Sequence, residues 1–589
     1  MRFRSRTAAA GRVYAVTGTN TVSFAIVASD ETKDGLLGFA VRRYDLADGT
    51  DKWMPGFKVF HTLVANPVPG ETVSTYDQPV QSFTWDDFTC EAGGRYRYVF
   101  HPLKGTPASL VRSATPLSLT IRTEPLYGEQ HDVFFNRGVA SSQAYTRLYG
   151  NAPIKDLDAE RQKQALGWLS RDLDDALLRF IGEAQPGDQI LGCFYEFTYL
   201  PAAEALKAAI DRDVDVQLIV DGKQNATATQ PAFPLTENLD TLGKAGITTD
   251  NYRLRGARKS AIAHNKFMVH VPQGAVPTQV WTGSTNLTDG GVAGQTNVGH
   301  WVRDRGAAVA FQAYWNLLSS DPGGRTGVDS ASVVRAKNSE FRDAVEQLSP
   351  VPTDLHTVPT GVTSVFSPRH TTAVLDSYEV LLDTATREGC ITFAFGVGAG
   401  FKELLKDNTA QNAIVFMLLE SRDRPNPHDP SAYVRINASN NVYQAWGSYL
   451  ANPVYQWAKE TNAGILGLNH HVNYVHSKFL LVDPLSDDPI VVTGSANFSE
   501  ASTQENDENM IIVRGDRRTA DIYLTEFNRL FNHYYFRSVT EATAGEPQSV
   551  LDASLFLAED ASWQLKYQPG SLKAKRLALY ESMAGFTRA

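Results

Sequence analysis

Cysteine is scarce in this chain, and its scarcity excludes two kinds of protein. The 589 residues include three cysteines, Cys90, Cys193 and Cys390, which are odd in number and far apart in the sequence. This usage excludes a disulfide scaffold and a cysteine-based zinc site, and it is typical of a reducing compartment.

Long apolar runs and targeting signals are also missing. No stretch approaches the ~18 apolar residues that a membrane-spanning helix needs. The chain starts with basic residues, but the apolar run Val22–Ala28 is short and is interrupted by Ser23, so it predicts a strand and not a signal peptide. Together with the cysteine usage, these absences predict a cytoplasmic protein.

Positive charge is limited as well. The formal net charge is −10 and the pI is about 5.8, so the chain has no general attraction to polyanions. Contact with nucleic acid or anionic lipid therefore requires a local basic patch. One candidate patch is the run Arg253, Arg255, Arg258 and Lys259, although an exposed loop explains it equally well. No glycine-rich nucleotide loop, metal-binding His/Cys cluster or Ser-His-Asp elbow is present, so we expect no cofactor and no metal.

The chain is long enough for roughly two to four domains, and its first part has the pattern of an all-β domain. Short apolar alternations separated by turn residues predict an antiparallel sandwich of seven strands over residues 1–125. The last two resemble the closing strands of a fibronectin type III module, so we interpret this part as an accessory domain for structure or for docking to a partner or membrane. The seven predicted strands are Arg12–Val16, Val22–Ala28, Gly38–Tyr44, Lys58–Val64, Gln81–Trp85, Tyr96–His101 and Leu117–Thr123.

From about residue 130 strands alternate with helices, and the pattern then repeats. The repeat predicts a duplicated α/β domain with halves at 130–340 and 341–545, followed by a tail at 546–589 that contains a helix at Leu572–Met583. The second half is longer between matching motifs, and we assign the extra residues to Arg422–Asn441. Each half has a predicted strand, helix and strand, at Asp188–Tyr199, Ala202–Ile210 and Val214–Asp221, and at Cys390–Gly396, Phe401–Lys406 and Ala413–Glu420.

Both halves carry a His-x-Lys element. The first contains His264 and Lys266, and the second contains His476 and Lys478. In a strand, positions i and i+2 lie on the same face, so the histidine and the lysine of each element project together. Histidine can act as a nucleophile or as an acid near neutral pH, and lysine can neutralise a phosphoryl oxygen.

A Gly-Ser-x-Asn turn follows each His-x-Lys element at almost the same spacing. Backbone N–H groups, a hydroxyl and a carboxamide in such a turn can bind the non-bridging oxygens of a phosphate. Each motif alone is common, but the same order and spacing in both halves argue strongly against chance. The two copies predict one site for in-line displacement through a phosphohistidine without a metal. The predicted phosphate-binding residues are Ser284, Asn286, Ser495 and Asn497.

These clusters resemble the His-x-Lys-x4-Asp signature of the phospholipase D superfamily, which includes lipases, a small bacterial endonuclease, phospholipid synthases and DNA-repair phosphodiesterases. The resemblance implies two α-β-α halves related by pseudo-twofold symmetry. It also implies that one histidine attacks phosphorus and the other acts as acid and base, and we assign these roles to His264 and His476. The second half matches fully, including Asp483, and Gly494–Met510 looks close to the endonuclease branch.

The first half departs from the family pattern at two positions. Val271 stands where the family has aspartate, a residue that is mainly structural there. Asn297 occupies the position that matches Glu508, which the family pattern expects to orient a histidine. We expect Glu508 to make His476 the more basic imidazole, and Asn297 to leave its histidine less basic.

Two classes of function fit these observations. The first is a phosphodiesterase, acting on nucleic acid or on phospholipid. The endonuclease likeness, the Arg253–Lys259 run and the missing secretion signal favour nucleic acid slightly, whereas chain size and the β-rich start favour phospholipid. The second is a binding protein in which a degenerate first motif holds phosphate without turnover. Val271 and Asn297 favour this second class, and the two intact His/Lys pairs oppose it.

Overall fold

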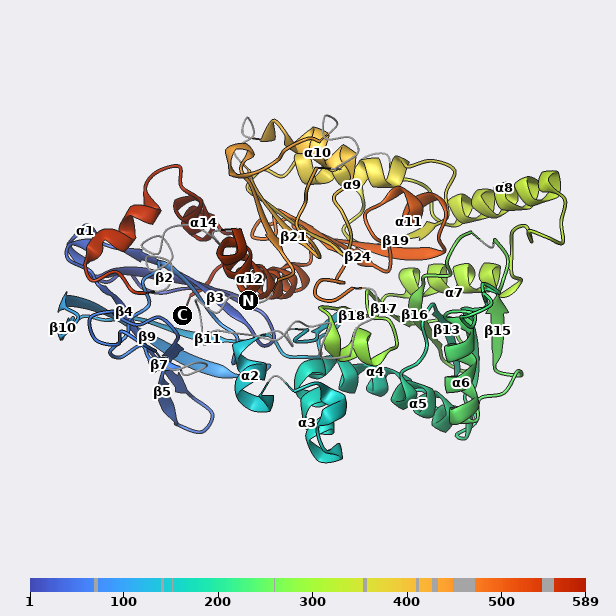
Figure 1. Ribbon diagram of the computed structural model, residues 1–589, viewed down its shortest axis with the longest axis horizontal. Helices are drawn as coiled ribbons and strands as arrows, with labels where there is room; N and C mark the ends of the chain where they lie inside the picture. Colours follow the sequence, from blue (N-terminus) through green and yellow to red (C-terminus); the bar gives the residue numbers. More distant parts are fainter. Residues whose placement is uncertain are drawn as a thin grey trace.

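The β-rich start of the chain forms two packed antiparallel sheets (Figure 1). The computed structural model describes residues 1–67, 72–138, 142–150, 152–258, 260–352, 357–408, 413–425, 433–448, 472–542 and 556–588. Phe24 of one sheet and Tyr98 of the other lie with their ring centroids 4.6 Å apart in a shared apolar core. The first sheet has the order β26-β1-β2-β3-β8, and the second has the order β10-β9-β4-β5 with β11 paired to β9. Their strands are β1 (Arg2–Arg4), β2 (Gly11–Thr17), β3 (Val22–Ala28), β4 (Gly38–Asp45), β5 (Asp51–Trp53), β8 (Thr84–Asp87), β9 (Arg95–Thr106), β10 (Ser109–Arg112), β11 (Leu117–Arg122) and β26 (Thr587–Arg588).

One of the seven predicted strands is wrong. Lys58–Val64 forms turns, and Phe60 makes only an isolated bridge to Leu557. Val59 and Phe60 are adjacent and both buried, so they do not follow the alternation of a strand with one exposed face. The other six predicted strands overlap β2, β3, β4, β8, β9 and β11.

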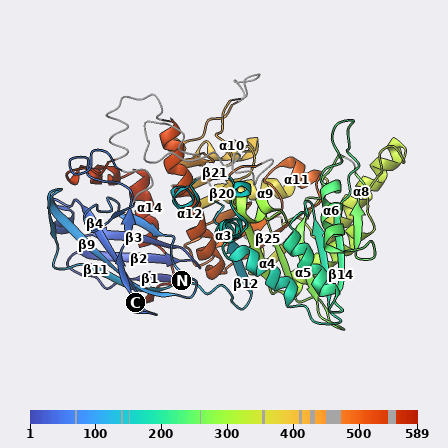
Figure 2. The ribbon, with the colours of Figure 1, turned by 60° about the horizontal axis from the view of Figure 1, so that its bottom comes forward.

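The tail of the chain packs on the β-rich start. The predicted helix at Leu572–Met583 is confirmed as α14 (Leu572–Glu581), which lies against β2, β3 and β8. Before it, Trp563 is buried and donates from Nε1 to the carbonyl oxygen of Leu36 at 2.9 Å. Strand β26 then pairs in parallel with β1, so the two ends of the described chain meet in one sheet (Figure 2).

Each half of the α/β region contains one seven-stranded mixed sheet, and the strands of the two sheets follow the same order. Within each sheet the His-x-Lys strand, β16 or β23, lies between two antiparallel neighbours. The first sheet comprises β12 (His131–Phe135), β18 (Val298–Val302), β17 (Gln279–Gly283), β16 (Lys266–Val271), β13 (Gln189–Phe194), β14 (Asp215–Asp221) and β15 (Tyr252–Arg255). The second comprises β19 (Gly361–Ser367), β25 (Glu508–Arg514), β24 (Ile490–Gly494), β23 (Phe479–Val482), β20 (Glu388–Phe393), β21 (Ile414–Leu419) and β22 (Val442–Trp446).

Two long helices join these sheets. Helix α7 (Arg305–Ser319) packs on strands of the first sheet and on β19 of the second, and α12 (Arg517–Ala542) packs on strands of the second sheet and on β12 of the first. Phe267, Phe479 and Phe527 therefore belong to one continuous core. The other helices include α4 (Asp172–Gly182), α5 (Leu200–Ile210), α6 (Leu235–Ala245), α9 (Ala373–Asp383) and α10 (Ala399–Leu405), which lie on the outer sides of the sheets (Figure 1).

The extra residues of the second half do not lie at Arg422–Asn441, where they were predicted. Residues 420–441 separate β21 from β22, which is fewer than the residues 222–251 that separate β14 from β15 and include α6. The extra length lies after β22, because residues 447–478 precede β23 whereas residues 256–265 precede β16. Parts of the originally assigned stretch, at 426–432, lie outside the described residues. Among the described helices, none is both long and apolar enough to cross a membrane.

Arg2 connects the start of the chain to the second half. Its guanidinium is buried and binds Asp521 of α12 at 2.8 Å. It also donates to the carbonyl oxygens of Pro484, Leu485 and Ala584 at 2.7, 2.8 and 2.9 Å. One cation therefore holds three segments that are distant in the sequence.

Arg2→Ala is expected to lower the free energy of unfolding by about 3 kcal/mol, because it leaves Asp521 and several carbonyl groups buried without this donor. Urea unfolding followed by tryptophan fluorescence measures the change. Arg6→Ala is the matched control, because Arg6 is exposed and its loss should change the value by less than about 0.5 kcal/mol. Equal midpoints for the two variants would contradict this account.

Candidate active site

The two His-x-Lys elements lie at equivalent places, directly before or at the start of a central strand. Lys266 opens β16, and Lys478 directly precedes β23. In each element the lysine Nζ donates to the carbonyl oxygen of its own histidine at 2.7 Å. All four side chains are buried, with 6% of His264 and 5% of His476 exposed. In each pair the lysine side chain is therefore held by the backbone of its own histidine.

The partner of each histidine comes from the opposite half. His264 Nδ1 lies 2.9 Å from both carboxylate oxygens of Glu508. His476 Nδ1 lies 2.9 Å from Oδ1 of Asn297. The two histidines are thus supported by groups of different charge, and both contacts cross from one half to the other.

Backbone contacts between the halves explain this exchange. The N–H of Thr296 donates to the carbonyl oxygen of Tyr474 at 2.8 Å, and the N–H of His476 donates to that of Thr296 at 3.2 Å. On the other side the N–H of Asp507 donates to the carbonyl oxygen of Ile262 at 3.0 Å. Asn297, which follows Thr296, therefore lies against His476. Glu508, which follows Asp507, lies against His264.

The expected pairing of Glu508 with His476 is wrong. Glu508 binds His264, and Asn297 binds His476. The sequence indicates only that Glu508 and Asn297 are equivalent positions. It does not show which histidine each one faces, because that depends on how the two halves pack.

Hydrogen bonds fix the orientation of both supporting groups. Asn297 donates from Nδ2 to the carbonyl oxygen of Gly291 at 2.8 Å, so its Oδ1 must face His476. The hydroxyl of Ser284 also donates to this Oδ1, at 2.8 Å. In the other half the hydroxyl of Ser495 donates to Glu508 at 2.6 Å. The serines of the two polar turns thus orient the groups that hold the histidines.

Burial and charge set the protonation of the site. Burial lowers the pKa of His264 to about 4, although Glu508 opposes this shift. Burial, and then Lys478 and Lys266, hold the pKa of His476 well below its usual value. Burial likewise lowers the pKa of Lys266 to about 8 and holds the pKa of Lys478 well below its usual value. Burial opposes the charge of Glu508, but His264 and Lys266 outweigh it and keep the pKa of Glu508 below its usual value. At neutral pH the site holds neutral imidazoles beside a carboxylate.

The two polar turns require glycine at their first position. Gly283 and Gly494 have φ values of +141° and +159°, which side chains rarely allow. A Cβ at either position would lie 2.2 Å from a carbonyl oxygen, that of Val298 or Asn509. The glycines let β17 and β24 end close to the neighbouring strand, which places each turn beside the histidines.

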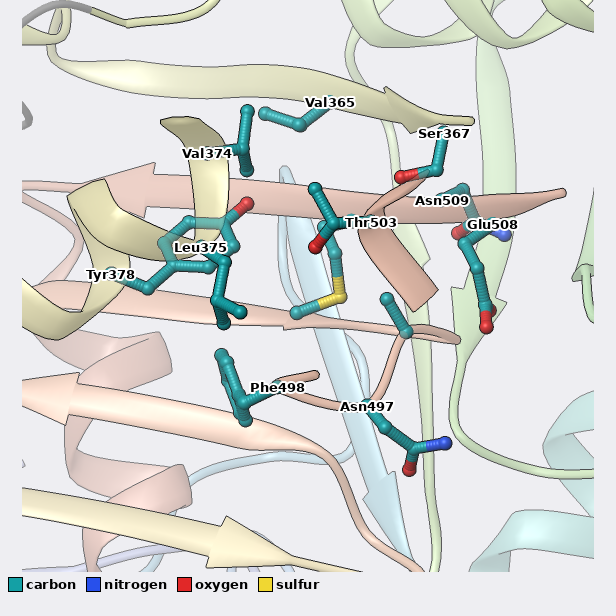
Figure 3. Close-up of a pocket in the computed structure, with 12 residues that line it drawn as sticks. Val365, Ser367, Val374, Leu375, Tyr378, Asn497, Phe498, Thr503, Glu508 and Asn509 are labelled. Carbon is teal, nitrogen blue, oxygen red and sulfur yellow. The ribbon is translucent and has the colours of Figure 1, made fainter. Parts of the chain in front are cut away.

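Asn286 and Asn497 are the last residues of the two polar turns, and their neighbours differ. Asn286 donates from Nδ2 to Glu196 at 2.5 Å. Asn497 lines a pocket together with Glu508, and apolar residues such as Leu375, Tyr378 and Phe498 form the other wall (Figure 3). The second half therefore offers an apolar recess beside its supporting carboxylate.

Asp483 acts on the backbone, away from the histidines. Its carboxylate accepts from the N–H groups of Thr386, Arg387 and Glu388 at 2.9, 2.8 and 3.0 Å. It thus ties the end of β23 to the start of β20.

The first half makes the same tie from the opposite strand. Val271 stands at the matching position, but Asp188 directly before β13 accepts from the N–H of Gln273 at 2.9 Å and lies 2.8 Å from Nε2 of His270. In the first half the connecting carboxylate thus directly precedes β13, whereas in the second half it directly follows β23. The loss of aspartate at position 271 therefore leaves the strand connection intact.

Two acidic residues that the sequence analysis missed hold the chain before each histidine. Asp221 at the end of β14 accepts from the N–H of Ala263 at 3.1 Å. Glu420, which directly follows β21, accepts from the N–H groups of residues 473–475 at 2.8, 3.0 and 2.7 Å. They occupy equivalent positions in the two halves. The acidic residue at the end of each of these matching strands is a sequence signal from which both could have been predicted.

Two arginines of the basic run before the first motif are buried, whereas Arg253 is exposed. Arg255 is buried and binds Asp321 at 2.6 Å and Asp507 at 2.8 Å. Arg258 is also buried and lies 3.2 Å from Asp507. Lys259 lies outside the described residues. These arginines tie the two halves together and do not form an exposed polyanion patch.

The described ranges were also searched for clusters of metal-ligating side chains. There, no group of three or more His, Cys, Asp or Glu residues is arranged to hold a metal ion.

Comparisons with known proteins identify the family of the two α/β halves. The family model described as cardiolipin synthase, PLD-like domain, matches twice, at residues 177–318 and 390–531. A mitochondrial cardiolipin hydrolase from Xenopus tropicalis is 33% identical over 109 residues, which are 18% of this chain and 46% of that protein. The chain thus spans about half the length of this curated relative.

Solved structures of low similarity also match. A phosphatidylserine synthase from Haemophilus influenzae is 10% identical with a TM-score of 0.41, covering 70% of this chain and 93% of that one. A phospholipase D family member from Salmonella typhimurium is 18% identical with a TM-score of 0.21, covering 29% of this chain and 94% of that one.

The duplicated α/β fold and the two family matches define a protein with two phospholipase D-like domains in one chain. These two domains, at residues 177–318 and 390–531, belong to the phospholipase D superfamily.

The charge of the site predicts that His264 is neutral at pH 6–8. Glu508 favours the imidazolium, so Glu508→Gln should lower the pKa of His264 further below about 4. Nitrogen-15 NMR of histidine-labelled protein, with His264→Asn to assign the signal, measures this titration. An imidazolium signal from His264 at pH 7 would contradict the prediction.

Proposed function

We propose that this protein hydrolyses phosphodiesters through a phosphohistidine. The observation that supports this most directly is the crossed pair of contacts, Glu508 to His264 and Asn297 to His476, beside two buried lysines. The exchange requires both halves for each histidine, so we also propose that the halves are related by a pseudo-twofold axis through one shared site.

His264 is the nucleophile in this proposal. Its Nδ1–H donates to Glu508, which leaves the lone pair on Nε2 to attack phosphorus. As the P–N bond forms and the P–O bond breaks, the imidazole becomes positive, and the carboxylate stabilises that charge. The assignment of His264 as the nucleophile therefore agrees with the position of Glu508, because Glu508 supports His264 and not His476.

His476 is the proton donor and acceptor. His476 is neutral in the free site, so it takes up a proton together with the anionic substrate, whose negative charge favours the imidazolium. A neutral amide supports this imidazolium less than a carboxylate does, so protonated His476 is a strong acid that gives its proton to the leaving alcohol. In the second step neutral His476 removes a proton from water, the water oxygen bonds to phosphorus, and the P–N bond breaks. Lys266 and Lys478 neutralise the non-bridging oxygens, and Asn286 and Asn497 complete the phosphate site.

Phospholipids become the leading substrate class in this proposal, ahead of nucleic acid. The preference for nucleic acid used the Arg253–Lys259 run, but Arg255 and Arg258 are taken up in buried ion pairs. The matching family model and the curated relative are both named for cardiolipin, a phospholipid. The β-rich domain at residues 1–125 then serves to dock on a membrane or a partner.

The binding-protein alternative loses its two arguments. Asp188 replaces the missing aspartate at position 271, and Asn297 makes an oriented hydrogen bond to His476. Both departures from the family pattern therefore keep the site assembled.

Activity is expected to survive EDTA, since the lysines supply the positive charge that a metal would otherwise provide. Purified protein is assayed with and without chelator on bis(p-nitrophenyl) phosphate, phosphatidylglycerol vesicles, plasmid DNA and RNA. His264→Asn and His476→Asn should each lower turnover about 10³-fold or more. Loss of activity in EDTA with rescue by added metal, or near-normal turnover of either variant, would refute the mechanism.

Glu508→Gln should lower kcat about 10- to 100-fold, because the His264 imidazolium loses its carboxylate. The acid limb of kcat/KM should move to lower pH, since the pKa of His264 falls. Asn297→Ala is the matched variant at the equivalent position and should cost less than about 10-fold, as expected for a neutral hydrogen bond. Full pH–rate profiles on bis(p-nitrophenyl) phosphate compare the two. Equal losses would show that the difference between the halves has no mechanistic role.

A further inference from the structure

The outer side of the second β-rich sheet carries exposed arginines on neighbouring strands. Arg95 and Arg97 lie on β9 and Arg122 lies on β11, and all three residues are exposed. In the register of the sheet Arg122 pairs with Arg95, so two arginines stand directly opposite each other. Tyr44 of β4 pairs with Arg97 on the other side of β9. Arg95, Arg97 and Arg122 thus form one arginine face.

A row of alternating arginines and aromatic rings begins at this face. In order along the row, the residues are Arg97, Tyr44, Arg42, Trp53, Tyr76 and Arg112. Successive separations are 4.3, 5.0, 5.4, 4.9 and 3.3 Å, from guanidinium carbon to ring centroid or, between Trp53 and Tyr76, from centroid to centroid. Asp51 pairs with Arg42, and Asp77 lies 3.6 Å from Arg112. Stacking on a ring orients a guanidinium group and leaves its N–H groups able to bind phosphate.

The charge of the arginine face is not balanced within the protein. Among the ion pairs of the described residues, none involves Arg95, Arg97 or Arg122. Like charges directly opposite each other on neighbouring strands destabilise a sheet, so the pairing of Arg122 with Arg95 does not serve stability. The chain as a whole has a formal net charge of −10. A positive cluster on such a protein gives an anionic partner one defined place to bind.

The aromatic rings favour a lipid surface over single-stranded nucleic acid as that partner. Proteins that hold single strands without sequence preference stack bases on open ring faces. Here Tyr44 already contacts two guanidinium groups, and Trp53 contacts one guanidinium group and two further rings. Tryptophan and tyrosine are also common at the headgroup level of membranes. Leu46, which is 43% exposed and donates its N–H to the carbonyl oxygen of Arg95 at 2.9 Å, adds an apolar side chain beside the arginines.

We propose that the arginine face docks the protein on an anionic phospholipid bilayer. This specifies the docking role of the β-rich domain, and it rests on the proposed function for the choice of lipid as the substrate class. The guanidinium groups bind headgroup phosphates, for which their planar fork of N–H donors is suited. Because the surrounding protein is acidic, an anionic bilayer meets this face in preference to the others.

Cosedimentation of the whole chain with vesicles tests the docking, with His264→Asn included so that the lipid stays intact. Vesicles of equal parts phosphatidylcholine and phosphatidylglycerol should bind this protein about 100-fold more tightly than phosphatidylcholine alone, and added salt should weaken the binding. Replacing all three residues of the arginine face by glutamine should lower the affinity about 100-fold, which is roughly fivefold for each arginine lost.

A matched variant removes the same charge from other exposed positions. Lys244→Gln, Arg305→Gln and Arg335→Gln together should change the affinity less than about threefold, since these residues lie in the first α/β half. Arg335 belongs to α8 (Ala331–Leu348), at the opposite end of the molecule from the β-rich domain (Figure 1). Lysine at all three positions of the arginine face keeps the charge and should retain most of the affinity. Equal affinities of the two glutamine variants, or no preference for phosphatidylglycerol, would overturn the proposal.

Single-stranded DNA is the alternative ligand with the same charge. Fluorescence anisotropy with labelled oligothymidylate measures its binding to the same proteins. Replacing the arginine face by glutamine should change this weak binding less than it changes vesicle binding. Oligonucleotide binding that depends on the arginine face, together with vesicle binding that does not, would overturn the proposal in favour of nucleic acid.

A water-soluble substrate separates this proposal from the proposed function. Bis(p-nitrophenyl) phosphate needs no membrane, so the glutamine variant of the arginine face, with His264 intact, should hydrolyse it at the wild-type rate. The same variant should be about tenfold or more slower on phosphatidylglycerol vesicles, because fewer molecules are bound. If the wild type hydrolyses neither substrate but vesicle binding depends on the arginine face, the proposed function fails and the docking face stands. If the soluble diester is hydrolysed and vesicle binding does not depend on the arginine face, the docking proposal fails alone.

Discussion

The contact between His264 and Glu508 is the interaction on which the rest of the site depends. It joins a buried imidazole to a buried carboxylate from the other half, so neither half contains a complete histidine environment. A buried charge is stable only with partners, and Glu508 has them in His264, Lys266 and Ser495. The backbone contacts at Thr296 and Asp507, the buried Arg255 and the shared core around Phe479 all keep the two halves in the register that this contact needs.

The local parts of the site could be predicted from the sequence, and the parts that depend on packing could not. Sequence proximity places His264 beside Lys266, at the start of β16, and a glycine turn places Ser284 near the end of β17, so both follow from the local sequence. The identity of the residue that faces each histidine depends on contacts between residues more than 170 positions apart, such as His476 and Asn297. No periodicity records such a contact. For this reason the pairing of Glu508 was predicted with the wrong histidine.

The fold shows the same division. The repeated strand, helix and strand of each half were predictable because their apolar patterns are strong. The extra residues were misplaced to Arg422–Asn441 because its Pro, Asp and Asn content is typical of an insertion, whereas α6 fills the longer matching stretch of the first half. Lys58–Val64 was predicted as a strand because it is apolar, although Val59 and Phe60 are buried beside the tail and do not alternate. The pairing of β26 with β1 could not be predicted, because it joins opposite ends of the sequence and has no local sequence pattern.

The presence of both halves in one chain has a consequence for how such a site can change. In a symmetric dimer of identical subunits, any substitution appears on both sides of the axis at once. Replacing the supporting carboxylate there would remove it from both histidines together. Here one gene encodes the two sides separately, so Asn297 can occupy in the first half the position that Glu508 occupies in the second. Covalent fusion thus allows the two sides of the site to acquire different supporting groups, which a homodimer cannot do by point mutation.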